Sequence, residues 1–167
     1  MKTIIKLIFT ITLTLTLTLT FSVNAFAKSP VPYGPAITLE QAKIVAAAAE
    51  AQAIKNKWPV AIVIADSGGN TVLLYKLDNT QHLSVKIAEG KAKTAVNLRR
   101  PTKLLQEAVA KGGAALRLLA VDGLLPLEGG IPIIVDGKLI GGIGISGVTS
   151  AQDAEAAQTG IDALLKQ

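Results

Sequence analysis

Apolar positions that cluster or alternate along this chain predict two β-hairpins. Residues 60–65 are apolar and mostly β-branched, as in a strand that is covered on both faces. Turn-forming residues follow at 66–70, and the strands of the second hairpin flank Asp136-Gly137, the pair that a tight type I′ turn favours. We predict strands over residues 60–65, 71–77, 131–135 and 138–145.

Helical periodicity occurs before, between and after the hairpins. Thr38 and Gln41 match a capping box, in which two side chains satisfy free backbone N–H groups at a helix start, and Pro59 ends this first helix. In the last helix, Ser150 is the predicted N-cap and Asp153 the acid of a similar box. Further helices are predicted over residues 83–98, 102–110 and 150–165.

Residues 102–130 show the least regular pattern. Thr102 is expected to cap the short helix that Gly112-Gly113 ends. Residues 114–130 are ambiguous, and we predict a short strand over 116–121 with a loop after it. The order helix, hairpin, helices, hairpin, helix is typical of a single α+β domain, with helices packed on an antiparallel sheet.

The first 27 residues have the three-part layout of a secretory signal peptide. Lys2 and Lys6 provide a positive start, residues 7–23 carry no charge, and Ala25-Phe26-Ala27 offers a small-x-small cleavage site. A membrane anchor is the alternative, but the stretch is short and rich in threonine, so we expect no stable membrane insertion after cleavage. We therefore predict a periplasmic or secreted protein, divided into a signal peptide (1–27), a flexible lead-in (28–37) and one domain (38–167).

Composition excludes several kinds of chemistry. The chain has 167 residues, one histidine and no cysteine, so disulfides, thiolate metal sites, cysteine nucleophiles and two-histidine metal motifs are all excluded. The formal net charge of +5 falls when Lys2 and Lys6 leave with the signal peptide. An exported protein of modest positive charge is not expected to meet nucleic acid.

Residues 142–147 read G-x-G-x-x-G and precede a helix. A dinucleotide site needs this motif in a βαβ unit with an acid about 20 residues later, whereas here the strand belongs to a hairpin and Gln167 takes the place of the acid. The glycines more simply allow another backbone or a flat ligand to approach the strand. Thr149 and Ser150 then lead into a helix N-terminus, which favours a carboxylate or phosphate.

The single histidine and a basic segment are the remaining candidates for a binding site. His82 follows a turn, and it is either a solvated surface residue, an axial metal ligand or a single proton carrier. A basic run is usually a solvated face, but arginine also presents a planar fork to carboxylates, so an anion clamp is the functional alternative. The basic segment consists of Lys91, Lys93, Arg99, Arg100 and Lys103.

Several short motifs occur in a fixed order over residues 38–165. They are D-x-x-G-N at 66–70, D-N-T-Q-H at 78–82, G-K-A-K-T-A at 90–95, R-P-T at 100–102, G-G-x-P-I at 129–133 with Asp136-Gly137, and the glycine run at 141–147. Each motif is weak alone, but their combination and order are fairly specific, and together they resemble the GlcG/HbpS-like haem-binding family, also called haem-degrading. The same module is similar to the C-terminal domain of PduO-type corrinoid adenosyltransferases.

The resemblance implies a profilin-like α+β fold, symmetric homo-oligomers, and haem binding in exported members. His82 stands where one branch of the family carries a histidine, so the resemblance makes it the candidate iron ligand. The basic segment lies where haem propionates are expected, again by position. The candidate cofactor-binding residues are His82, Arg99, Arg100, Lys103, Thr149 and Ser150, with His82 as the candidate metal ligand and no catalytic residue assigned.

We therefore predict an exported haem-binding protein used in haem scavenging, sensing or redox protection. Haem degradation is the enzymatic alternative, but oxygen activation needs a defined axial ligand and distal pocket, and neither can be identified from the sequence. Two further alternatives stay open. One is a binding module for another tetrapyrrole such as a corrinoid, or for a carboxylate metabolite, and the other is a purely structural oligomer.

Overall fold

The computed structural model describes residues 30–167, so the predicted signal peptide lies outside the described residues. One antiparallel sheet contains four strands in the order β2-β1-β4-β3. The two hairpins are confirmed, and Asp136 and Gly137 both have positive φ (50° and 72°), as a type I′ turn requires. The strands are β1 (Ala61–Asp66), β2 (Thr71–Lys76), β3 (Gly130–Val135) and β4 (Lys138–Ser146).

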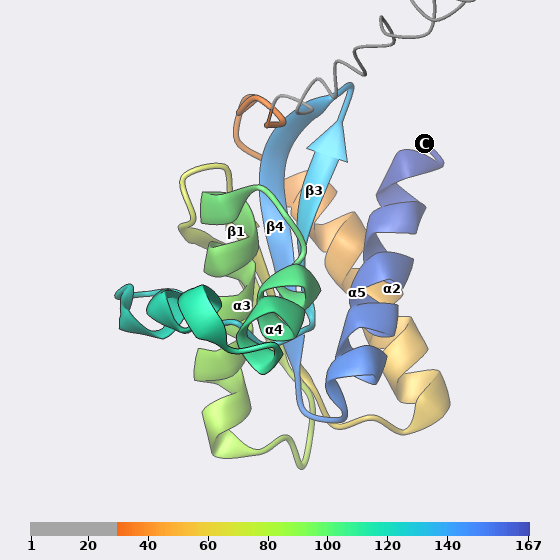
Figure 1. Ribbon diagram of the computed structural model, residues 1–167. Coiled ribbons are helices and arrows are strands. Elements are labelled where there is room, and N and C mark those ends of the chain that lie inside the picture. Colours follow the sequence, from red (N-terminus) through yellow and green to blue (C-terminus); the bar gives the residue numbers. More distant parts are fainter. Residues whose placement is uncertain (1–29) are drawn as a thin grey trace, which may run out of the picture.

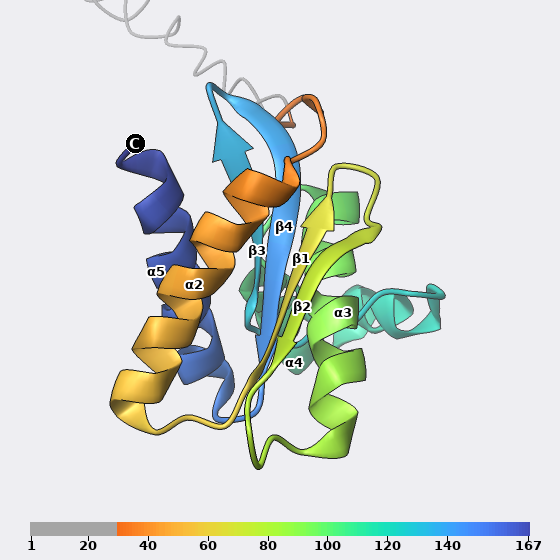
Figure 2. The same ribbon diagram turned by 180° about the vertical axis from the view of Figure 1, so that it is seen from behind.

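Helices cover both faces of this sheet. Figures 1 and 2 show α2 and α5 together on one face, and α3 on the other. The predicted α+β fold, with an antiparallel sheet flanked by helices in a single domain, is confirmed. Within residues 30–167, no helix combines the length and apolar character that a bilayer span requires. The helices are α2 (Leu39–Asn56), α3 (His82–Leu98), α4 (Thr102–Ala110), the 3₁₀-helix η1 (Gly113–Ala120) and α5 (Ser150–Leu165).

Alternating residues of the central strands supply two hydrophobic cores. Strand β1 is buried on both faces, as its apolar sequence predicts. The branched side chains of the sheet fill the core under α2 and α5, while smaller residues meet α3. The first core includes Ile62, Ile64, Ile133, Ile143 and Ile145, and the second includes Ala61, Val63, Ala65, Ala88, Ala92 and Val96.

The glycine motif of β4 allows α3 to lie directly on the strand. A Cβ on Gly144 would overlap the carbonyl oxygen of Ala88, and a Cβ on Gly142 would come within 2.8 Å of the Val96 side chain. Of the two interpretations that the sequence left open, the close approach of another backbone is therefore correct. The motif belongs to the packing of the fold and contributes no dinucleotide site.

Helix starts agree with the predictions in one case and differ in two. The capping box of Thr38 and Gln41 is present at α2. Thr102 was expected to cap α4, but its N-cap is Pro101. The Thr102 hydroxyl instead accepts the N–H of Gly130 at 2.9 Å and donates to the Gly130 carbonyl, because Thr102 is buried against β3.

The prediction of Ser150 as N-cap of α5 is wrong by one residue. Thr149 is the N-cap, and Gln152 completes its capping box. Asp153 is left free of the box and points into the protein, where its carboxylate accepts a hydrogen bond from Lys91 at 2.7 Å. The helix start differs from the prediction by one residue because the Asp153 carboxylate pairs with the buried ammonium of Lys91 and does not take part in the capping box.

The prediction of a short strand over residues 116–121 is also wrong. This segment forms η1, which projects from the body of the molecule next to α4 (Figure 1). Gly112 and Gly113 have φ values of 73° and 62° and direct the chain away from the sheet. Leu116 and Leu119 have an i, i+3 spacing that suits the three-residue turn of a 3₁₀-helix.

The last residues of the expected lead-in contact the sheet. Tyr33 forms a parallel bridge with Leu139, whose N–H donates to the Pro32 carbonyl at 2.9 Å. The N–H of Ile37 donates to Ile140, and the Ile37 side chain is buried. Between Pro32 and Pro35, the N–H of Gly34 donates to the Leu139 carbonyl at 2.7 Å, so this part of the segment pairs with β4.

Candidate functional site

The outward face of α3 carries the histidine and two lysines. His82, Lys86 and Lys93 lie at i, i+4 and i+11, so they share one face of the helix. All three are exposed. The two ion pairs found within residues 30–167 involve Lys91 and Lys103, which leaves Lys86 and Lys93 outside any ion pair of the described part.

An apolar hollow adjoins this face. It has a volume of about 510 Å³, which lies within the range of small-molecule sites, and it is open to solvent on one side. Its α3 wall begins at the residue after His82, and its other wall is the loop that follows η1. The lining residues are Leu83, Lys86, Ile87, Gly90, Gly123, Leu124, Leu125 and Leu127.

Two residues of α3 hold the loop in place. The buried Thr94 hydroxyl accepts the N–H of Leu125 at 2.8 Å and lies 3.5 Å from the carbonyl oxygen of Gly123. Gly90 lets the loop approach, because a Cβ there would lie 2.9 Å from Cδ2 of Leu125. The walls of the hollow are therefore positioned by the helix itself.

A polar rim continues the hollow toward the β1–β2 turn. This second part, of about 350 Å³, shares Lys86, Gly90 and Gly123 with the apolar part. It adds Glu89 and Lys93 of α3. We call the two parts together the α3 hollow. It joins an apolar floor to a rim that carries two lysines and one glutamate.

Three residues of the predicted basic segment, Arg99, Arg100 and Lys103, lie beyond the other end of α3. His82 is the first residue of the 17-residue helix and Arg99 follows the last, so they are roughly 25 Å apart along the axis. Arg99 stacks over the Tyr33 ring at 5.1 Å and donates to the Val31 carbonyl. Lys103 pairs with Glu128 at 3.1 Å. Within one protomer, the fold does not bring Arg99, Arg100 or Lys103 together with His82, and Lys93 is the one member of the basic segment that shares a helix face with it.

Lys91, which the sequence places in a solvated basic segment, is buried. Its side chain is 2% exposed, and its Nζ donates to Asp153 Oδ2 at 2.7 Å and to the Ile145 carbonyl at 2.8 Å. Burial lowers the pKa of Lys91 and raises the pKa of Asp153, and the hydrogen bond between them opposes both shifts. The pair joins α3, β4 and α5, so Lys91 has a structural role.

The predicted anion site at the start of α5 is filled by the protein's own side chains. Thr149 and Gln152 are engaged in their capping box. The carboxylate of Asp153 accepts the N–H of Val148 at 3.3 Å. The Gln152 N–H of the first turn is therefore capped by Thr149, and the N–H just before the cap serves an internal carboxylate, while Ser150 follows the cap without contributing to it.

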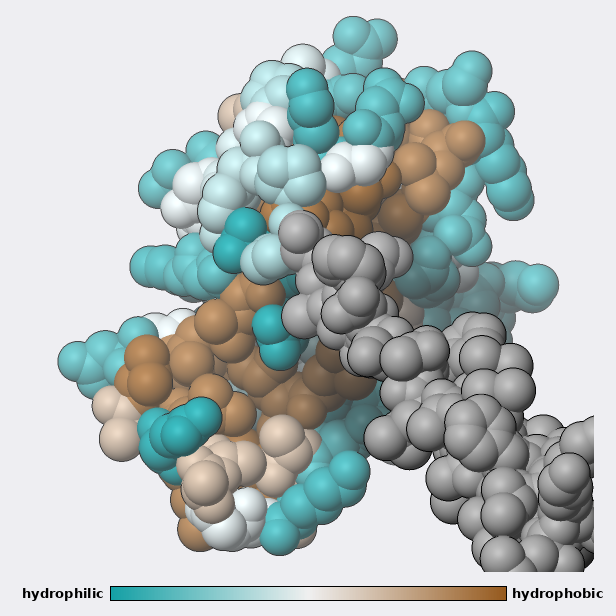
Figure 3. All heavy atoms as spheres, turned by 45° about the horizontal axis from the view of Figure 1, so that its top comes forward, coloured by the Kyte–Doolittle hydropathy of each residue, from teal (hydrophilic) through white to brown (hydrophobic). Residues whose placement is uncertain are grey.

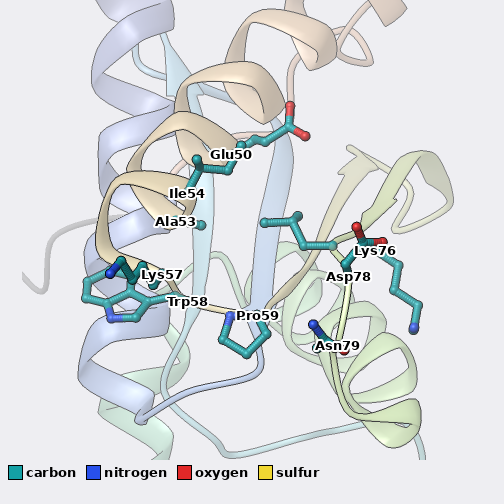
Figure 4. A pocket seen from close by; sticks show the side chains of 10 residues that line it. Glu50, Ala53, Ile54, Lys57, Trp58, Pro59, Lys76, Asp78 and Asn79 are labelled. Atoms are coloured by element: carbon teal, nitrogen blue, oxygen red, sulfur yellow. The ribbon is translucent and has the colours of Figure 1, made fainter.

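A second hollow, of about 560 Å³, lies between the end of α2 and the end of β2. Glu50, Lys57, Lys76 and Asp78 contribute charges of both signs. Figure 4 shows these side chains spread around the hollow, with Lys57 and Lys76 on opposite sides of it. Ligand sites carry a few polar groups that converge on one place, and this hollow has none that do.

The leucines of the α3 hollow are not among the candidate residues predicted from the sequence. Leu83 and Ile87 form an apolar i, i+4 pair on α3, while Ala88 and Ala92 already form its buried side. A second apolar stripe on a helix whose first stripe packs on the sheet was the available signal. Among residues 30–167, no group of three potential metal-ligating acidic or histidine side chains lies together.

The fold and this hollow define a small α+β domain that presents an apolar floor and a cationic rim to a ligand. The chain belongs to the HbpS-like family, described as haem-degrading proteins, whose family model matches residues 37–162.

Relatives of known name agree with this assignment. Protein GlcG of Escherichia coli (strain K12) is 38% identical over 110 residues, which cover 66% of this chain and 81% of GlcG. A double mutant of Streptomyces reticuli HbpS has a similar structure, with a TM-score of 0.72 and 31% identity over 80% of this chain and 90% of HbpS. PduOC, solved as a complex with haem, has a TM-score of 0.71 and 32% identity over 77% of this chain and 94% of PduOC.

Proposed function

We propose that this protein is exported and binds haem in the α3 hollow. The observation that carries the proposal is the leucine-lined hollow whose α3 wall starts beside His82. Membership of the HbpS-like family and the haem complex of PduOC support haem as the ligand. The signal-peptide pattern of residues 1–27 supports export.

The residues of the hollow fit the chemistry of a haem. A porphyrin is a flat apolar ring with two carboxylates, and the hollow offers leucine and isoleucine side chains next to a rim with lysines. Bound haem supplies a redox-active iron. Leu83 and Leu125 would shield the porphyrin from water, and the exposed imidazole of His82 would be the residue to hold the iron.

A second copy of the chain is the expected cover for the open side. Leu116, Leu119 and Val121 are 50%, 61% and 50% exposed. Figure 3 shows apolar side chains gathered on the lobe that contains η1. Exposed apolar patches of this kind commonly mark subunit interfaces, and a symmetric homo-oligomer would bury them. Light scattering gives the oligomeric mass of wild type and of Leu119→Glu. We expect a smaller mass for the variant, and equal masses would contradict an interface at η1.

Haemin titration tests the haem site. The protein without residues 1–27 is titrated while the Soret band is recorded, for wild type, His82→Ala and the neighbouring control Gln81→Ala. We expect saturable binding by wild type and control, and a shifted Soret band with weaker binding for His82→Ala. The absence of a saturable change with wild type would refute haem binding. A Soret band that is the same in His82→Ala as in wild type would refute His82 as the iron ligand.

The same complex separates a carrier from an enzyme. Ascorbate or peroxide is added, and the Soret band, biliverdin and released iron are followed. We expect a stable Soret band, as in a protein that binds haem for scavenging, sensing or redox protection. Loss of the band with stoichiometric biliverdin would instead establish haem degradation.

Export has its own measurement. The full chain is expressed, and the intact mass of the protein recovered from the periplasm and the medium is determined. We expect a mass that corresponds to a start at Lys28, after cleavage behind Ala27. An uncleaved chain in the cytoplasm would contradict export and leave the haem titration unaffected.

A further inference from the structure

We infer that Lys86 and Lys93 recognise the carboxylates of the ligand, so that the α3 hollow selects tetrapyrroles by their free propionate groups. This inference rests on the proposed function and deepens it. It keeps only Lys93 of the predicted basic segment, and it replaces Arg99, Arg100 and Lys103 as the source of the cations.

Both lysines belong to the hollow. Lys86 lines its apolar part and its polar rim, and Lys93 lines the rim one turn beyond Gly90. The stem of Lys93 runs beside the β1–β2 turn, because a Cβ on Gly69 would lie 3.3 Å from Lys93 Cγ. The turn therefore supports the lysine at the edge of the site, on the same face of α3 as His82.

Three other cations near α3 already have side-chain partners, and Arg100, beyond the far end of the helix, donates to the Leu98 carbonyl. Lys91 pairs with Asp153, Lys103 pairs with Glu128, and Arg99 lies over Tyr33. Glu89 lies three residues after Lys86 and four before Lys93, within reach of either. Because one glutamate neutralises at most one lysine, the rim keeps a net positive charge.

Lysine suits this task chemically. A propionate is a flexible, acceptor-only group, and an ammonium is a compact charge with three donors on a flexible stem. The contact between them does not depend on a metal, whereas an axial bond from His82 does. Two contributions to binding are therefore expected, one that requires free carboxylates and one that requires iron.

Three ligands separate these contributions. Haemin, metal-free protoporphyrin IX and haemin dimethyl ester are titrated against wild type at low and high salt, with Soret absorbance and quenching of the Trp58 fluorescence as readouts. We expect binding of haemin and metal-free protoporphyrin, and about tenfold weaker binding of the ester, with the difference shrinking at high salt.

Charge-matched double variants locate the carboxylate contact. Lys86→Ala/Lys93→Ala is expected to weaken haemin and protoporphyrin about tenfold and to leave the ester unchanged. Lys43→Ala/Lys55→Ala, which removes two exposed charges from α2, serves as the control. Circular dichroism confirms that each variant is folded.

The outcomes distinguish this inference from the proposed function. If wild type binds no haemin, the proposed function fails. If wild type binds haemin and the ester equally, or if Arg100→Ala/Lys103→Ala causes the loss instead, haem binding stands and the assignment to Lys86 and Lys93 is refuted. Loss of haemin binding with His82→Ala but not with the lysine variant also refutes it.

Discussion

Two lysines of α3, five residues apart, occupy opposite environments. Lys91 is buried against β4 and α5, where Asp153 and a backbone carbonyl satisfy its ammonium. Lys86 is exposed at the rim of the α3 hollow. The inward face of the helix joins the layers of the fold, and the outward face is left available to a ligand.

The inward face tolerates little change, because each group on it has a specific neighbour. The charge of Lys91 needs Asp153, and the backbone of α3 needs the glycines of β4. The outward face carries side chains with space around them. Substitutions on the two faces of the same helix should therefore separate stability from binding.

Lys91→Met gives the largest expected effect. It leaves the Asp153 carboxylate buried without its cation, and removing one partner of a buried ion pair costs about 3–5 kcal/mol. Lys86→Met, the matched control on the outward face, should change the free energy of unfolding by less than about 0.5 kcal/mol. Urea unfolding of both variants measures the difference.

The double variant Lys91→Met/Asp153→Asn sharpens this test. It removes both charges while keeping an acceptor for the N–H of Val148, so it should lose less stability than the two single variants added together. Equal losses for Lys91→Met and Lys86→Met would show that the pair does not stabilise the fold.

Gly144→Ala comes next. Its Cβ would overlap the Ala88 carbonyl, so α3 must move away from β4, at a cost of about 3 kcal/mol. Gly142→Ala should cost about half as much, since its Cβ would come within 2.8 Å of the Val96 side chain and 3.0 Å of the Ala92 carbonyl oxygen and so requires a smaller displacement. Thermal and urea unfolding give the order of the two. The reverse order would contradict the close approach of α3 at Gly144.

Short-range patterns predicted most of the fold. The hairpin of β3 and β4 was predictable because Asp136-Gly137 determines the turn, and β1 because its buried residues are continuous. The strand expected at residues 116–121 failed because Gly112 and Gly113 redirect the chain, which only the surrounding structure decides. The prediction of the N-cap of α5 failed because Asp153 accepts a hydrogen bond from Lys91, which lies 62 residues away in the sequence.

The site was less predictable, because its parts meet only in space. His82 and the lysines were visible as residue types, but the sequence grouped Lys91 and Lys93 together although they lie on opposite faces of α3. The leucines of the loop after η1 reach α3 through a hydrogen bond from Leu125 to Thr94 that no spacing rule indicates. Long-range contacts of this kind determine which of several candidate cations line the α3 hollow.

Gly90→Ala tests the boundary between the two faces. Alanine favours the helix by about 1 kcal/mol over glycine, while its Cβ must displace the Leu125 side chain. We expect a net change in stability within about 1 kcal/mol and several-fold weaker haemin binding. Unfolding and Soret titration are measured on the same preparation. Strong destabilisation without an effect on haemin binding would show that Gly90 serves the packing of the fold and not the α3 hollow.

The smallest expected effect concerns the β1–β2 turn, which borders the rim of the hollow. Burial tends to raise the pKa of Asp66, but hydrogen bonds from Asn70 and Gly68 outweigh it and hold the pKa below its ordinary value. A carboxyl group with a lowered pKa stabilises the folded state above the pKa of the unfolded chain, and this contribution is lost as the pH falls through the folded value. Asp66→Asn should therefore cost about 0.5 kcal/mol near neutral pH, a value kept small because the group is solvent-accessible, and progressively less as the pH falls below the ordinary carboxyl pKa. Unfolding measured across this pH range checks the direction of the effect, and a cost that grows toward acid pH would contradict the prediction.

Because the turn supports only the outward face of α3, loosening the turn should weaken the placement of Lys93 and leave the Lys91–Asp153 pair intact.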